Sequence, residues 1–392
     1  MLALFAFVAT AMAAPEDPPA ADLPAVPPST SAASPPLTDA LDARLSALEA
    51  QLSQMQQEAL LREAEALAGP DTPPPAQGGG RAAFNALNPG ITAFGDLVGQ
   101  VGAVDGALMN GSTMYLRSLE LELRAAVDPF ATANAVIAFE QEAPPLEGGP
   151  GEGFGAAPEE AYIDLVALPW RLSARLGKFK QPFGVANRMH PHDLPWTDVP
   201  PALATLGEEG LNDVGGSLTK IVPLGPAALT LTAGVGSGEP FDQAGTSPLP
   251  SGIGRAEVFV QRGDFAVVAG GSAVAAPGTD AAVYGGDLML RWRKNERKSA
   301  VLITEVLQAN DGDPAAYAAL QLQPARGFYV GFREDIAADG LTHSAYLSKY
   351  TSEFLRFRAG GGYAPSTGQV TGLAQLTFVW GSHPVEPWWV NR

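Results

Sequence analysis

The sequence predicts an all-β protein, a closed antiparallel transmembrane β-barrel of about 16 strands preceded by a short N-terminal coiled-coil helix. Three observations lead to this fold class. Short segments from Ile91 onward alternate apolar with polar or small residues, which is the period of a β-strand. The connections between them alternate between tight turns and longer loops, as in outer-membrane barrels. Charged residues recur on the polar face of these segments.

Composition excludes several other classes. The 392 residues include no cysteine, so the chain has no disulfide, zinc–thiolate site or cysteine nucleophile. Its 24 Lys and Arg against 42 Asp and Glu give a formal net charge of −18. Nucleic acid is therefore not an expected partner, because phosphate binding requires a basic surface. After the first dozen residues, no segment reaches the roughly 18 consecutive apolar residues of a membrane-spanning helix.

The N-terminal part is expected to direct export and then to act as a tether. Residues 1–13 are apolar and end in Ala11-Met12-Ala13, the small-x-small pattern of a secretory signal. An apolar N-terminal strand is the alternative for this stretch. Residues 14–37 are rich in Pro and Ala, which is typical of an extended linker.

A heptad pattern follows in residues 38–68. Its apolar positions are Leu41, Leu45, Leu48, Leu52 and Met55, spaced as in a coiled coil. The alternative is a surface helix that packs on its own chain. We expect this helix to lie in the periplasm and to contact cell-wall material. Residues 69–87 form a second flexible linker, residues 88–380 the barrel and residues 381–392 a C-terminal extension.

Sixteen strands are expected in the barrel, with lengths near the 9–11 residues or so of a tilted membrane strand. They lie at 91–100, 115–126, 132–141, 159–167, 171–178, 214–221, 227–236, 253–262, 265–275, 282–293, 299–308, 315–323, 326–334, 340–349, 354–364 and 368–379. The longer connections are 101–114, 142–158, 179–213 and 237–252. A soluble sandwich has no reason to place its long loops on one side, and an even number of strands closes a barrel.

The polar face of the strands is predicted to line a pore. A charge buried in an apolar core costs several kcal/mol unless it is paired, so repeated inward charges indicate a water-filled interior. The predicted pore-lining residues are Glu120, Glu122, Arg124, Arg171, Arg175, Glu257, Asp287, Arg291, Arg333, Arg356 and Arg358. The alternative is that these faces are the solvated outside of a soluble sheet.

The inward charges also predict an ion preference. With Arg293 included, eight arginines face four acids, the acids being Glu120, Glu122, Glu257 and Asp287. Fixed positive charge raises the local concentration of anions, so this count favours an anion-preferring pore.

The loop after the fifth predicted strand, residues 179–213, is expected to narrow the barrel. Opposed charges at a constriction set a transverse field and a size limit. Its candidate residues are Lys180, Arg188, His190, His192, Asp193, Asp198, Glu208 and Glu209. His190-Pro191-His192-Asp193 also permits an interpretation as metal ligands, because a His-x-His pair can chelate. Loop packing is the favoured interpretation, and no metal or cofactor is predicted.

Five segments carry a resemblance to a known family. They are Asn88–Asp96, Glu120–Phe130, Glu159–Gly184, His190–Trp196 and Leu206–Asp213. Together they resemble an uncharacterised family of bacterial outer-membrane porin-like proteins, related to the phosphate-selective porins. The resemblance implies sixteen strands, an N-terminal coiled coil and a homotrimer. It does not imply phosphate, because the selectivity of that group rests on a lysine and arginine array and this chain has few lysines.

The predicted function is passive diffusion of small hydrophilic solutes or ions through the bacterial outer membrane, with lipid around the barrel. An energy-coupled receptor would need about 22 strands and a plug larger than residues 14–80 provide. A barrel enzyme would need a Ser/His constellation, and none of the four histidines lies in one, so no enzyme is predicted. A structural anchor is the remaining alternative.

Overall fold

The computed structural model describes residues 90–141, 145–146, 153–207, 210–241, 250–276, 281–310 and 312–381. All of them belong to the second of two compact units, Gly78–Arg392. Several predicted features lie outside the described residues. These are the signal at 1–13, the linkers at 14–37 and 69–87, the coiled coil at 38–68, Glu208, Glu209 and the C-terminal extension after Gly381.

The barrel strands follow one another along the chain. They are β1 (Gly90–Val104), β2 (Ala107–Leu108), β3 (Thr113–Asp128), β4 (Ala131–Glu140), β5 (Gly155–Leu168), β6 (Leu172–Lys180), β7 (Asn212–Leu224), β8 (Ala227–Gly236), β9 (Ser251–Arg262), β10 (Phe265–Ala275), β11 (Ala282–Asn295), β12 (Lys298–Ala309), β13 (Ala315–Ala325), β14 (Phe328–Ala337), β15 (Gly340–Ser352), β16 (Leu355–Ala364) and β17 (Gln369–Trp380). The predicted strands 227–236 and 265–275 coincide with β8 and β10.

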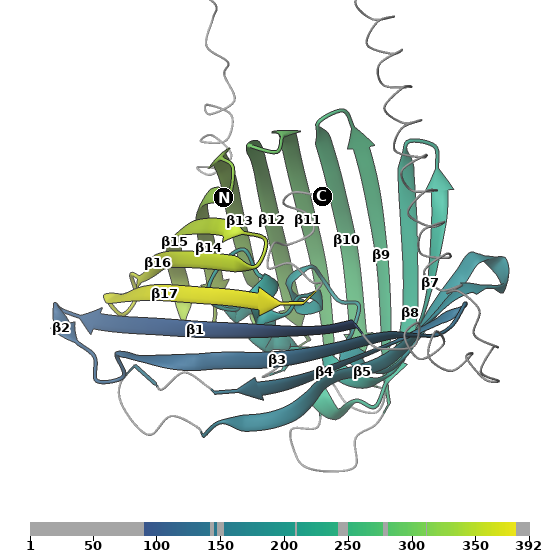
Figure 1. Ribbon diagram of the computed structural model, residues 1–392, viewed down its shortest axis with the longest axis horizontal. Coiled ribbons are helices and arrows are strands. Elements are labelled where there is room, and N and C mark those ends of the chain that lie inside the picture. Colours follow the sequence, from purple (N-terminus) through teal and green to yellow (C-terminus); the bar gives the residue numbers. More distant parts are fainter. Residues whose placement is uncertain are drawn as a thin grey trace, which may run out of the picture. The chain divides into compact units, whose positions relative to one another are not determined.

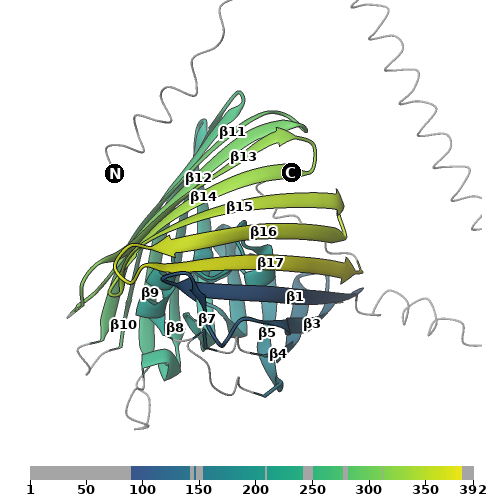
Figure 2. The ribbon, with the colours of Figure 1, turned by 90° about the vertical axis from the view of Figure 1, so that its left-hand side faces the viewer.

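These strands form one closed antiparallel sheet (Figures 1 and 2). Each long strand pairs with the next, and β17 returns to β1 in a register that runs from Ala93 opposite Trp380 to Ala103 opposite Val370. The two-residue β2 lies in the connection from β1 to β3, which pair with each other, so 16 strands make the wall. Closure leaves no strand edge unpaired. The predicted fold of a closed 16-stranded barrel is confirmed.

Two β-bulges change which residues point inward. Opposite the step from Asp96 to Leu97, β3 carries an extra residue, Arg117. Opposite the step from Val136 to Ile137, β5 carries the extra residue Glu159. A bulge breaks the two-residue alternation of a strand, so side chains assigned to the outer face by simple parity arrive inside.

The outer face of the wall is apolar. On β14, Phe332 and Ile336 are about half exposed, whereas Tyr329 and Arg333, one residue out of phase with them, are buried. Large apolar side chains exposed in the same way are Leu176, Leu218, Leu231, Leu290, Leu347 and Phe357.

In the parts that the structure describes, the connections carry short 3-10 helices. They are η1 (Pro169–Arg171), η2 (Ala186–Arg188), η3 (Pro191–Asp193), η4 (Pro201–Leu206) and η5 (Glu239–Phe241). Within the described residues, no helix has both the length and the apolar character needed to span a membrane. Three of these turns belong to residues 181–211, which connect β6 to β7 and which we call the inner loop.

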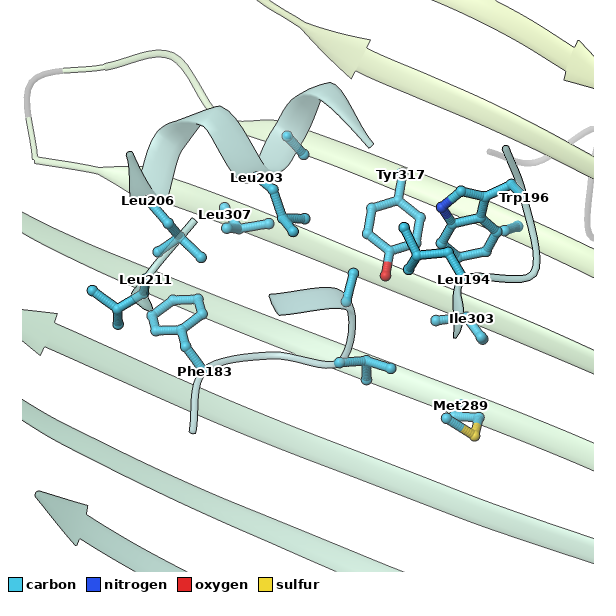
Figure 3. Close-up of a cluster of buried hydrophobic side chains, with 14 of the residues drawn as sticks. Phe183, Leu194, Trp196, Leu203, Leu206, Leu211, Met289, Ile303, Leu307 and Tyr317 are labelled. Atoms are coloured by element: carbon cyan, nitrogen blue, oxygen red, sulfur yellow. The ribbon is translucent and has the colours of Figure 1, made fainter. Parts of the chain in front are cut away.

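The hydrophobic core lies inside the barrel, between the inner loop and one side of the wall (Figure 3). Trp196, Leu203 and Leu206 of the loop are buried against wall residues such as Ile303 and Tyr317. Each such side chain contributes about 1.5–3 kcal/mol when it is fully removed from water. The other buried residues labelled in Figure 3 are Phe183, Leu194, Leu211, Met289 and Leu307. The loop therefore has an apolar face of its own that fixes it to the inner wall.

Candidate functional site

One anchor of the inner loop is an ion pair between Asp198 and Arg333 of β14. The Arg333 guanidinium donates from Nη2 to Asp198 Oδ2 (2.6 Å) and from Nη1 to the Asp198 carbonyl (3.0 Å). The Tyr346 hydroxyl donates to the second carboxylate oxygen at 2.8 Å. Burial alone would raise the pKa of Asp198, but the Arg333 charge and these hydrogen bonds hold it below its ordinary value. Asp198 is thus an anion fixed to the wall.

A second anchor is made by arginines that bind loop carbonyls. Arg358 of β16 donates from Nη2 to the Leu194 carbonyl at 3.0 Å and also from Nη1 to the Trp196 carbonyl. Arg117 of β3 donates to the Thr197 carbonyl. A buried carbonyl that loses its hydrogen-bond donor costs about 1–3 kcal/mol. The guanidinium groups provide the donors that backbone N–H groups provide in a helix or a sheet.

The third anchor is Glu305 of β12. Its carboxylate accepts from the backbone N–H groups of Val185 (2.5 Å) and Ala186 (3.0 Å) and from the Tyr317 hydroxyl (2.5 Å). Gly184 precedes these donors with φ of +56°, and a Cβ there would lie 1.9 Å from Glu305 Oε1. A side chain at this position would be strained by the positive φ and would displace the Glu305 carboxylate.

These anchors correct the expectation that inward charge means water throughout the interior. The side of the barrel that faces the inner loop is dry, and Arg333, Arg356 and Arg358 are at most 2% exposed. Arg356 donates to Thr377 Oγ1 at 2.8 Å. Arg333 is paired with Asp198 and Asp335, and Arg358 donates to loop carbonyls, so protein groups replace water around these two side chains.

Open space remains on the opposite side, between the inner loop and strands β3 to β8. The cavity there has a volume of about 590 Å³. Four predicted pore-lining residues line it, namely Glu120, Glu122, Arg124 and Arg175. Five predicted constriction residues also line it, namely Lys180, Arg188, His190, His192 and Asp193. Glu160 and Asp164 complete its charged lining.

The other predicted residues lie elsewhere. Arg171 belongs to the exposed turn η1 and not to a strand, because positive φ at Trp170 and Arg171 interrupts the alternation before β6 begins. Asp287 is buried in an ion pair with Arg255, and Arg291 lies on the same face of β11. Glu257 binds Arg255 and Arg188.

Several charged residues at the site were missed by the sequence analysis. Arg255 binds Asp287 at 2.6 Å and Glu257 at 2.7 Å, and its position two residues before Glu257 was signal enough to find it. Asp164 binds Arg175 at 2.7 Å, and the alternation of apolar and polar residues along β5 would have identified it. Arg117 and Glu159 had none, because both are the extra residues of bulges.

A cluster of histidines and carboxylates lies where the inner loop meets β3 and β5. His190 Nε2 lies 3.2 Å from Glu160 Oε2, and His192 Nδ1 lies 3.0 Å from Glu120 Oε1. Burial alone would lower the pKa of both imidazoles, but the neighbouring carboxylates raise the pKa of His192 and hold that of His190 well above its usual value. The neighbouring carboxylates therefore favour the protonated form of each ring.

We compared the chain with protein families, with curated proteins and with solved structures. No protein-family model matches the chain. An uncharacterised protein of Aquifex aeolicus is 31% identical over 141 residues, which are 36% of this chain and 27% of that protein. The chain thus spans about a quarter of the length of the curated relative it matches.

Solved structures of bacterial outer-membrane porins share the barrel. OprB of Pseudomonas putida aligns over 77% of this chain and 97% of its own, with a TM-score of 0.51 and 10% identity. OmpF of Salmonella typhi aligns over 76% of this chain and 99% of its own, with a TM-score of 0.50 and 9% identity. At this identity the likeness defines the class of fold, a porin-type barrel.

The turn at Gly184 tests the docking of the inner loop. Gly184→Ala should destabilise the barrel by about 1–3 kcal/mol, because it adds a left-handed strain and a clash with Glu305. The measurement is the thermal unfolding midpoint. Gly254→Ala is the matched control, since nothing lies within 4 Å of a Cβ at that position. Equal midpoints for the two variants would contradict the docked geometry.

The Asp198 anchor predicts an acid-dependent loss of stability. Its pKa is lowered on folding, so its contribution is complete above the ordinary value of 3.8 and disappears as the pH falls through the folded value. Asp198→Asn should remove about 1 kcal/mol at neutral pH, a small figure because the side chain is 44% exposed. Unfolding midpoints measured across acid pH should fall less steeply for this variant than for the wild type. Asp313→Asn, an exposed aspartate, should leave the profile unchanged.

Proposed function

We propose that this protein is an outer-membrane pore through which small hydrophilic solutes and ions diffuse passively. The observation that carries the proposal is a cavity of about 590 Å³ lined by charged side chains inside a closed barrel whose outer face is apolar. Charged side chains can line a protein interior without a large free-energy cost only if water or oppositely charged partners contact them. A catalytic role is not part of the proposal.

The apolar outer face supports a lipid surrounding. Leu290, Phe332 and Phe357 stand outward on β11, β14 and β16, at positions where a soluble sheet would carry polar side chains. Lipid provides no hydrogen bonds, and a closed barrel is one of two structures that satisfy all backbone groups there. Closed antiparallel barrels with an even number of strands are typical of bacterial outer membranes.

The inner loop supports a narrowed path. It packs against the inner wall of β9 to β15, β17 and β1, so the open space is displaced towards β3 to β8. Arg188 and Asp193 of the loop, together with Lys180 at the end of β6, contribute opposed charges to the cavity. We infer that solutes pass between these residues and Arg175 of β6.

The ion preference that we propose is weak and favours anions. The count of eight arginines against four acids no longer supports it, since Arg333, Arg356 and Arg358 are sealed behind the inner loop and Arg171 lies on a turn. Around the cavity, four Arg and Lys face five carboxylates, namely Glu120, Glu122, Glu160, Asp164 and Asp193. His190 and His192 add their imidazoles to this lining, so the fixed charges nearly balance and the proposed preference is weak.

The proposal also covers export, the N-terminal segments and the assembly of the barrel. We propose that residues 1–13 direct export, that the coiled coil of residues 38–68 lies in the periplasm near cell-wall material, and that the barrel assembles as a homotrimer. The heptad spacing and the sequence resemblance support these assignments.

Reconstitution in a planar lipid bilayer tests the function. The wild type should conduct, with a reversal potential in a salt gradient on the anion side. Arg175→Glu should move the reversal potential towards cations, because Arg175 is about one third exposed on the cavity wall and the change reverses its charge. Arg297→Glu, the same change on an exposed turn, is the control.

Each outcome decides between the alternatives. No conductance from a folded barrel would favour the structural anchor over the pore. Conductance with equal reversal potentials for the wild type and Arg175→Glu would place the ion path away from β6.

A further inference from the structure

Three side chains from two segments bring nitrogen and oxygen ligands together at the cavity. Glu120 stands on β3, and His190 and His192 flank Pro191 at the start of η3 in the inner loop. One ligand atom from each lies within 4.8 Å of the other two. Glu120 Oε1 is 3.0 Å from His192 Nδ1, and Glu120 Oε2 is 3.6 Å from His190 Nδ1. Ligand atoms of a tetrahedral ion with bonds of about 2.0–2.1 Å lie about 3.3 Å apart. Each ring nitrogen is thus close to this spacing from one of the two Glu120 oxygens.

The second nitrogen of each ring faces another carboxylate. His190 Nε2 is 3.2 Å from Glu160 Oε2, and His192 Nε2 is 3.6 Å from Asp193 Oδ1. Metal-ligating histidines show this pattern, in which a carboxylate holds the outer nitrogen and orients the inner one. Phe94 stacks on His192 with a centroid distance of 4.2 Å and further fixes that ring.

Several nitrogen and oxygen atoms of this cluster are buried and form no hydrogen bond with the described residues. His190 Nδ1 is buried and forms no hydrogen bond with any described residue, although Glu159 Oε1 lies 3.1 Å away. Glu159 Oε2 and Asp193 Oδ1 are also buried without a hydrogen bond from the described residues. All three ligand residues line the 590 Å³ cavity, which provides an entry path from solvent.

We propose that Glu120, His190 and His192 bind a divalent transition-metal cation of the zinc class. Two imidazoles and one carboxylate suit zinc and its neighbours, whereas calcium and magnesium prefer oxygen ligands only. Glu159, whose Oε1 lies 3.1 Å from His190 Nδ1, can supply a further ligand. The bound ion would link the inner loop to β3 and so hold the loop against the barrel wall. This site goes beyond passive diffusion and does not depend on it.

Titration calorimetry of the full chain, folded in detergent micelles and freed of metal by a chelator, tests the site. ZnCl₂ should bind with one ion per chain. Glu120→Gln, His190→Gln and His192→Gln should each weaken the affinity by at least about 10–100-fold, the loss that removal of even an outer partner causes. His343→Gln is the matched control, because His343 lies on β15 beside Glu334 and away from the cluster. CaCl₂ should not compete.

Two further observations keep the test independent of folding defects and of transport. Cobalt added to the wild type should give visible absorption bands that zinc abolishes, and zinc should raise the thermal unfolding midpoint of the wild type but not of the three variants. No zinc binding by the folded wild type would overturn the proposal. Binding that persists at wild-type strength in all three variants, or that His343→Gln removes, would overturn it as well. Neither result requires conductance.

Discussion

The structure depends on how the inner wall holds the irregular backbone of the inner loop. Arg117 and Arg358 donate to its carbonyls, Arg333 binds Asp198, and Glu305 accepts from its N–H groups. Without these partners, residues 181–211 would bury polar groups that neither a helix nor a strand satisfies. The side chains of the barrel wall therefore provide the hydrogen-bond partners that the loop backbone lacks.

This constraint divides the interior into two environments. On one side, apolar loop residues such as Trp196 and Leu206 complete a core with the wall, and the arginines there are buried. On the other side, Arg175 and Asp164 form an ion pair that keeps contact with solvent. The position of the cavity, and with it the proposed path for solutes, follows from where the loop docks. The histidine cluster lies at the border between the two environments.

Much of the barrel was predictable from the sequence because strand alternation and turn length are local properties. Leu290 and Phe332 are outside as expected, and Glu120 and Arg333 are inside as expected. The errors have physical causes that a local pattern does not contain. Bulges brought Arg117 and Glu159 inside, and the turn at Arg171 interrupted a strand. The dry side was unpredictable, since it requires knowing that Asp198 and Arg333, 135 residues apart, meet.

Cysteine accessibility measures the division of the interior most directly, because the chain has no cysteine of its own. Thr219 of β7 lines the cavity, whereas Ala319 of β13 points inward behind the loop and is 4% exposed. A small hydrophilic thiol reagent should modify Thr219→Cys rapidly in the folded barrel and leave Ala319→Cys unmodified. Equal modification of both positions would show that the loop does not seal its side of the barrel, and the account would fail.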